Sequence, residues 1–202
     1  MRYAIVSGSH RLESQSIKVS KWLAKALERR KHKTDIIDLA EDAVPILNQA
    51  VLEGASDLSK KMKPSLKKIA TADGIILVAP EWGSMVATGM KNFLTYVGSE
   101  HAAHKPTLLV GVSSNRGGAY PISDLRMSGN NNSRMVYIPD YLIVQDVNNV
   151  LNDHDMKSKN TNDIYIKKRA LYSLDVLDAY TKTLKEMRKT QDLLDEKYPF
   201  GM

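Results

Sequence analysis

Five short apolar segments recur along the chain, and stretches with a helical pattern lie between most of them. We predict a strand in each segment, at residues 3–7, 33–40, 74–80, 106–114 and 134–147. The segment 74–80, GIILVAP, is continuously apolar, which is typical of a strand that is buried on both faces. Strands that alternate with helices form a parallel sheet with helices on both faces, so we predict the α/β class.

The intervening stretches carry apolar residues at three- and four-residue spacings, which predicts helices. Their ranges are 16–30, 57–72, 87–98, 120–129 and 164–194. Pro64 lies within one of them, and we expect a helix start or a kink there because an interior proline costs about 3 kcal/mol. We expect loops at 41–56, 128–133 and 152–163. With no repeat and no linker, the whole chain, 1–202, is predicted to be a single domain.

The composition excludes several classes of site. The 202 residues include no cysteine, so disulfides, thiolate metal sites and cysteine nucleophiles are excluded. No apolar run approaches the roughly 18 residues that a bilayer requires. The N-terminal residues turn polar too soon for a signal peptide. We therefore expect a cytoplasmic protein with no membrane partner.

The formal charge is +6, and basic residues cluster at 27–33, 60–68 and 165–170. Nucleic-acid binding would require aromatic residues among these charges, or a known binding motif. Neither is found, so we interpret the clusters as solvated helix faces and expect no nucleic-acid partner. The positive field would still attract an anionic cofactor or substrate.

The segment SGSHRLESQS, 7–16, joins the first predicted strand to the first predicted helix. Ligands of α/β sheets bind at the carboxyl ends of the strands, and a helix N-terminus favours phosphate. Three serine hydroxyls and one guanidinium in this loop suit a phosphate group: Ser9, Ser14, Ser16 and Arg11. The nucleoside-triphosphate and dinucleotide glycine motifs are missing, which favours a single phosphomonoester. The alternative is that these serines are ordinary helix N-caps.

Two further loops should meet the first at the same edge of the sheet. They are PEWGSM, 80–85, and SSNRGGAY, 113–120. Trp82 offers a flat apolar face, and the serines of the second loop can bond the polar edge of a heterocycle. Together the three loops predict a site for a phosphorylated aromatic cofactor, with ordinary turns as the alternative.

Several segments, taken in order, resemble the NADPH-dependent FMN reductase family, which includes quinone, chromate and azo-dye reductases. GSHRLESQS, 8–16, is similar to its phosphate loop GSxRxxSxN. PEWGSMVATGMKN, 80–92, resembles the family's segment PEYNxSxPGxLKN. Residues 38–49 resemble the family's loop after strand two, and residues 105–119 resemble its fourth strand and flavin loop. The resemblance covers residues 1 to about 147. It implies a flavodoxin-like three-layer sandwich with a five-stranded parallel sheet in the order 2-1-3-4-5.

The resemblance also implies which residues bind FMN. Those around the phosphate would be Ser9, Arg11, Ser14 and Ser16, with a backbone contact from Gln15. Those along the isoalloxazine ring and ribityl chain would be Pro80, Glu81, Trp82, Gly83, Ser84 and Met85. Those at the pyrimidine side of the ring would be Ser113, Ser114, Arg116, Gly117 and Gly118. The chain departs from the family pattern at Ser16, Trp82 and Gly83, and at Ala87 and Thr88 in place of Pro-Gly.

By the same resemblance, NADPH or NADH would reduce bound FMN, and the flavin would then reduce a quinone or another small acceptor. The cofactor carries this chemistry, so we predict no catalytic residue and a structural role for Glu81. We predict no metal site, and we interpret His101 and His104 as a surface pair. The family implies a homodimer or homotetramer, with residues 87–98 contributing to the interface.

Two alternatives remain open at this point. One is a flavodoxin-type electron carrier, which the basic charge disfavours because such carriers are typically acidic. The other is a flavin-free interaction module on the same fold, supported only by the departures at 83 and 87–88.

Overall fold

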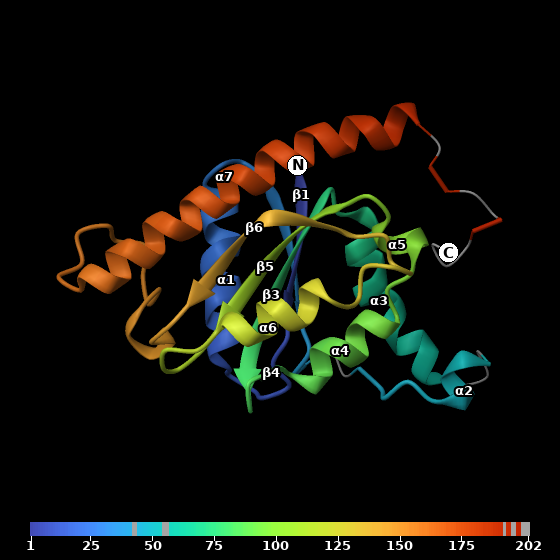
Figure 1. Cartoon of the computed structure of the whole chain (residues 1–202), viewed down its shortest axis with the longest axis horizontal. Coiled ribbons are helices and arrows are strands. Elements are labelled where there is room, and N and C mark those ends of the chain that lie inside the picture. The colour runs from blue at the N-terminus through green and yellow to red at the C-terminus, as the bar shows by residue number, and fades with distance from the viewer. Residues whose placement is uncertain (42–43, 54–56, 192, 195–196, 199–202) are drawn as a thin grey trace.

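A computed structural model describes residues 1–41, 44–53, 57–191, 193–194 and 197–198 (Figure 1). Its centre is a parallel sheet in the order β2-β1-β3-β5-β6. These strands are β1 (Arg2–Ser7), β2 (Lys33–Asp38), β3 (Gly74–Trp82), β5 (Pro106–Val112) and β6 (Val136–Val144). The short β4 (Met85–Val86) pairs antiparallel with the end of β3. Apart from β4, the predicted order 2-1-3-4-5 is confirmed.

Helices cover both faces of the sheet, so the molecule has three layers (Figure 1). One apolar core contains residues of α1 (Gln15–Glu28) and α7 (Thr161–Thr190). The other contains residues of α3 (Asp57–Thr71), α4 (Thr88–Thr95) and α6 (Ala119–Arg126). The central β3 is buried over its first seven residues, which explains its unbroken apolar sequence. None of the described helices is both long and apolar enough to cross a bilayer.

The structure corrects the predicted boundaries at several places. The expected helix 87–98 is shorter in the structure: α4 ends at Thr95, and a separate four-residue helix, α5 (Ser99–Ala102), begins beyond the predicted range. The expected loop 41–56 contains α2 (Gln49–Leu52), which the side chain of Asn48 caps. The last helix begins at Thr161, three residues earlier than predicted, because the side chain of Asn160 accepts hydrogen bonds from two amides of its first turn. These short caps and turns carry too few residues to produce a periodic pattern.

Two prolines, Pro64 and Pro139, lie inside regular elements. Helix α3 runs through Pro64 without beginning there. In β6, Pro139 lies where the register with β5 shifts, between the pairs Thr107↔Tyr137 and Leu109↔Tyr141. Because β6 is an edge strand, the lost backbone donor is tolerated there.

Candidate active site

The loops that follow β1 and β5, together with the last three residues of β3, line a cavity of about 430 Å³ at the carboxyl edge of the sheet. Its size is in the usual range for small-molecule sites. The residues that line it are Ser9, Arg11, Leu12, Glu13, Ser14, Gln15, Ser16, Pro80, Glu81, Trp82, Val112, Ser113, Ser114, Val147 and Asn148. The predicted loops 7–16 and 113–120 therefore meet at this edge, whereas the third segment, 80–85, reaches the cavity only through residues 80–82, which continue β3.

The serines of the first loop have different hydrogen-bonding roles. Ser14 is the N-cap of α1, and its Oγ accepts a hydrogen bond from the Ile17 amide at 3.2 Å. The Oγ of Ser9 accepts one from the Arg11 amide at 3.1 Å. Ser16 is 1% exposed, and its Oγ is buried without a partner among the described residues. The N-cap interpretation is thus correct for Ser14, whereas Ser16 has a hydroxyl available for a ligand.

Glu81 connects two of the loops. Its Oε2 accepts a hydrogen bond from the Gly118 amide at 2.5 Å. A Cβ at Gly117 would collide with the same carboxylate and would lie 3.1 Å from Ser113 Oγ. The absence of a side chain at Gly117 therefore lets the two loops approach, and Glu81 has the structural contact predicted for it.

Trp82 lies in the cavity wall, and His10 contacts it edge to face. The two ring centroids are 4.6 Å apart, with an interplanar angle of 80°. Beyond Trp82, Gly83 and Ser84 form the tight turn between β3 and β4, with φ values of 56° and 59°. Two successive residues with positive φ are typical of a type I′ hairpin turn. The departure at Gly83 therefore suits the backbone conformation at that position.

Several of the predicted residues do not line the cavity. These are Gly83, Ser84, Met85, Arg116, Gly117 and Gly118. The first three belong to the exposed β3–β4 hairpin. Arg116 lines a neighbouring hollow together with Asp146. The last two lie behind the wall, and a Cβ at Gly118 would meet the side chain of Ile143.

Five lining residues were not predicted as site residues: Leu12, Glu13, Val112, Val147 and Asn148. The last two belong to a 3₁₀ turn (Val147–Asn149) after β6, outside the three predicted loops. Lys18 of α1 holds this turn, because its Nζ donates to the carbonyl of Val147 and, at 2.9 Å, to that of Val150. Burial lowers the pKa of Lys18. Lys18 and Val147 are 129 positions apart, so no local sequence pattern links them.

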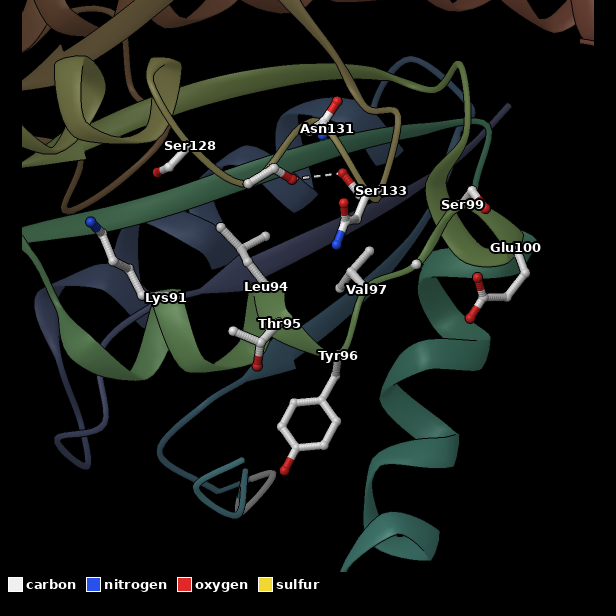
Figure 2. Close-up of a pocket in the computed structure, with 13 residues that line it drawn as sticks. Lys91, Leu94, Thr95, Tyr96, Val97, Ser99, Glu100, Ser128, Asn131 and Ser133 are labelled. Atoms are coloured by element: carbon white, nitrogen blue, oxygen red, sulfur yellow. Dashed lines mark hydrogen bonds between the residues drawn. The ribbon is translucent and has the colours of Figure 1, made fainter. Parts of the chain in front are cut away.

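A separate cavity of about 630 Å³ lies between α4 and the loop 128–133 (Figure 2). None of the predicted flavin-site residues lines it. Its lysine, Lys91, is already paired with Asp124 at 2.6 Å. Ser133 donates a hydrogen bond to the Gly129 carbonyl at 2.6 Å, drawn as a dashed line in Figure 2. Because these polar groups are already paired, the cavity at the carboxyl edge of the sheet is the better candidate for the functional site.

The predicted surface pair of histidines is not found. His101 Nδ1 accepts a hydrogen bond from the Gly98 amide at 3.1 Å, and the side chain is only 18% exposed. Burial lowers its pKa, while nearby Glu100 acts in the opposite direction. His104 lies beyond the end of α5 with a φ of 57°. The helical spacing fails because α5 has only four residues. No group of three potential metal ligands is found among the described residues.

A model of the NADPH-dependent FMN reductase family matches residues 1–149. The chain belongs to this family. A relative from Bacillus sp. (strain OY1-2), "NADPH azoreductase", is 27% identical over 129 residues, which are 63% of this chain and 68% of the relative. The "FMN-dependent NADPH-azoreductase" of Staphylococcus saprophyticus is 29% identical over 131 residues, with the same two coverages.

Solved structures share the fold at lower identity. FerB, a flavoenzyme NAD(P)H:(acceptor) oxidoreductase from Paracoccus denitrificans, has a TM-score of 0.63 and 19% identity, with 92% of this chain and 97% of FerB covered. An oxidoreductase from Corynebacterium diphtheriae has a TM-score of 0.66 and 13% identity, with 90% and 97% covered. The predicted flavodoxin-like fold is confirmed.

Membership in the family makes the chain an NAD(P)H-dependent FMN reductase, an oxidoreductase that uses FMN and NAD(P)H. The cavity fits a flavin phosphate. The first turn of α1 presents backbone amides and the positive end of the helix dipole. The buried, unpartnered hydroxyl of Ser16 lies in that turn, and Arg11 lines the same cavity.

Proposed function

We propose that the cavity at the carboxyl edge binds FMN and that NAD(P)H and a small quinone-like acceptor react there in turn. The observation that carries this proposal is the buried Oγ of Ser16, which has no partner among the described residues and belongs to a residue of the cavity wall. A buried hydroxyl without a partner costs about 1–3 kcal/mol, which a bound phosphate oxygen would offset. Bound FMN would supply the hydride chemistry.

The protein's own part is to bind and orient. Ser16, the Ser9 hydroxyl and the Arg11 guanidinium would hold the phosphate at the first turn of α1, together with the amide of Gln15. Trp82 would give the flavin ring an apolar surface beside Pro80. Ser113 and Ser114 would bond its polar edge. Glu81 would act through the Gly118 amide, by fixing the position of the loop 113–118.

Exposed apolar side chains at the cavity and on the adjacent β3–β4 hairpin support this choice of acceptor class. Leu12, which lines the cavity, is 71% exposed, and Met85 on the β3–β4 hairpin is 57% exposed. Apolar side chains around an open site favour a flat apolar acceptor, such as a quinone or an azo dye. The curated relatives described above are named for azo-dye reduction, which fits the same class.

The decisive experiment uses the absorption spectrum of the purified protein after FMN is added and the sample is desalted. We expect retained flavin that NADPH bleaches within seconds to minutes without oxygen and that a quinone then reoxidises. Flavin that is retained but stays oxidised would contradict the reductase activity and favour an electron carrier. A colourless protein would contradict the FMN site.

We also propose a homodimer or homotetramer that uses residues 87–98 and their flanks. Exposed apolar side chains on the neighbouring α6 and directly after it support this proposal, with Tyr120 at 60% and Met127 at 81% exposed. Sedimentation equilibrium should give a mass at least twice that of one chain, and Met127→Lys should weaken the association. A monomer at micromolar concentration would contradict the proposal.

A further inference from the structure

Each of the two tryptophans contacts a histidine ring. Trp22 and His154 are stacked, with ring centroids 4.8 Å apart and an interplanar angle of 7°. Trp22 is also 4% exposed, and its Nε1 donates to the carbonyl of Asp153 at 2.7 Å. The edge-to-face pair of His10 and Trp82 differs in its place, because Trp82 lines the flavin cavity and Trp22 does not.

The backbone around Trp82 is held more firmly than its indole ring. Trp82 pairs with Met85 across the β3–β4 turn, and the amide of Val86 donates to Asp124 Oδ2 at 3.3 Å. The side chain of Trp82 is only half-buried. Within the described part of the chain, the indole has no hydrogen bond and no aromatic neighbour other than His10. The orientation of the indole therefore depends on His10.

His10 is itself placed by the first turn of α4. A Cβ at Gly89 would lie 3.1 Å from His10 Nδ1 and 3.7 Å from its Cβ and Cγ, so the imidazole lies directly against this glycine. Glycine is less favourable than alanine within a helix, which fits a packing role at Gly89. In the same loop, a Cβ at Gly8 would collide with the side chain of Met90. The loop after β1 and the start of α4 are thus packed together, with His10 between α4 and Trp82.

We propose that His10 is a positioning residue of the flavin cavity, which fixes the orientation of the Trp82 indole in the cavity wall. An edge-to-face pair favours one distance and one relative angle of the two rings. Without the imidazole, the indole would exchange between rotamers, and the apolar surface that it offers to a ligand would vary. The consequence for FMN rests on the proposed function, whereas the orientation of Trp82 is measured without FMN.

The first test measures the motion of the indole. The chain has two tryptophans, so Trp22→Phe leaves Trp82 as the only one, and the decay of its fluorescence anisotropy reports its motion. We expect His10→Ala to add a fast rotation of the indole that His10→Phe, which keeps an aromatic ring, largely suppresses. Gly89→Ala should add part of the same motion, because its methyl group displaces the imidazole. Unchanged motion in His10→Ala would overturn the proposal.

His154→Ala is the matched control, since it removes the imidazole of the other pair. It should leave the motion of Trp82 unchanged, and an equal effect of His154→Ala and His10→Ala would overturn the proposal. If Trp22→Phe does not fold, the histidine variants are compared after labelling with 5-fluorotryptophan. The fluorine resonance that Trp82→Phe removes belongs to Trp82, and its relaxation rate should change in His10→Ala and stay constant in His154→Ala.

The second test measures the Kd for FMN in the chain that keeps both tryptophans. We expect His10→Ala to raise this Kd about fivefold and His10→Phe to stay within about twofold of the parent, because an ordered aromatic contact with the flavin ring is weakened only in the first variant. An unchanged Kd in His10→Ala would overturn the positioning role. If the parent binds no FMN, the proposed function fails, and the motion of the indole alone decides whether His10 orients Trp82.

Discussion

At the scale of single residues, two serines of α1 provide an internal comparison. Ser16 and Ser20 are both buried, and neither Oγ has a partner among the described residues. Only Ser16 lines the flavin cavity. The unpaired hydroxyl of Ser16 is therefore placed to contact a ligand, whereas the unpaired hydroxyl of Ser20 is buried in the packing of the protein away from the cavity.

Ser16→Ala should raise the Kd for FMN about tenfold, because a hydrogen bond to a charged phosphate contributes about 1.5–3 kcal/mol. The free energy of unfolding of the FMN-free protein should change little, since no protein partner is lost. Fluorescence quenching of FMN measures the Kd. Ser20→Ala serves as the control and should leave the Kd unchanged; equal Kd values for all three proteins would contradict the role of Ser16.

Glu81 is tested by two substitutions of different severity. Glu81→Ala removes the acceptor for the Gly118 amide, and we expect FMN affinity to fall about tenfold because the loop 113–118 loses its anchor. Glu81→Gln keeps a carbonyl acceptor and should restore most of the affinity. A Gln variant as weak as the Ala variant would show that the charge, rather than the hydrogen bond, is required.

At the scale of elements, a buried lysine holds the segment 151–155 against α7. Lys167 is 0% exposed and pairs with Asp163 at 2.7 Å as well as with Asp153. Asp163 Oδ1 in turn accepts a hydrogen bond from the Leu151 amide at 2.8 Å. This segment lines a groove beside α1, so α7 positions one wall of that groove.

Lys167→Met should lower the free energy of unfolding by about 3 kcal/mol, because it leaves Asp163 buried without its cation. Urea denaturation measures the loss. Lys167→Met/Asp163→Asn should recover part of it, since the uncompensated charge is removed. A single variant as stable as the parent would contradict the role of this ion pair.

Lys105 connects β5 to the end of α3, where its Nζ donates to the carbonyls of Ile69 and Ala70 at 2.7 and 2.6 Å. Burial, assisted by Arg188, lowers its pKa to about 8 from the usual 10.5. Between these two pH values the unfolded chain binds more protons at Lys105 than the folded one. The contribution of Lys105 to stability should therefore rise as the pH increases from about 8 to 10.5.

The measurement is the free energy of unfolding of the parent minus that of Lys105→Met, followed from pH 7.5 to 10. We expect this difference to grow with pH. A constant or falling difference would contradict a lowered pKa at Lys105.

At the scale of the whole molecule, binding of FMN should raise the thermal stability of the protein. FMN at about one hundred times its Kd adds roughly 2.7 kcal/mol to the folded state. For a chain of this length, that corresponds to an increase in Tm of about 5–10 °C. Differential scanning fluorimetry measures the shift. Riboflavin lacks the phosphate and should give a clearly smaller one; equal shifts would contradict the phosphate site at α1.

The sequence by itself determined the layered α/β fold and the three loops of the site. Both follow from local patterns: β3 is continuously apolar because it is buried on both faces, and parallel strands bring their carboxyl ends to one edge. The single-domain prediction for 1–202 stays a prediction, as do the FMN contacts.

Only the tertiary structure decided which residues complete the site. Val147 and Asn148 line the cavity because Lys18, on a helix far away in the sequence, hydrogen-bonds to the turn that contains them. Lys167, which has the appearance of a solvated lysine in the basic cluster 165–170, is buried because two aspartates meet it. Such contacts join residues with no periodic relation along the chain, so their geometry exists only after the helices have packed onto the sheet.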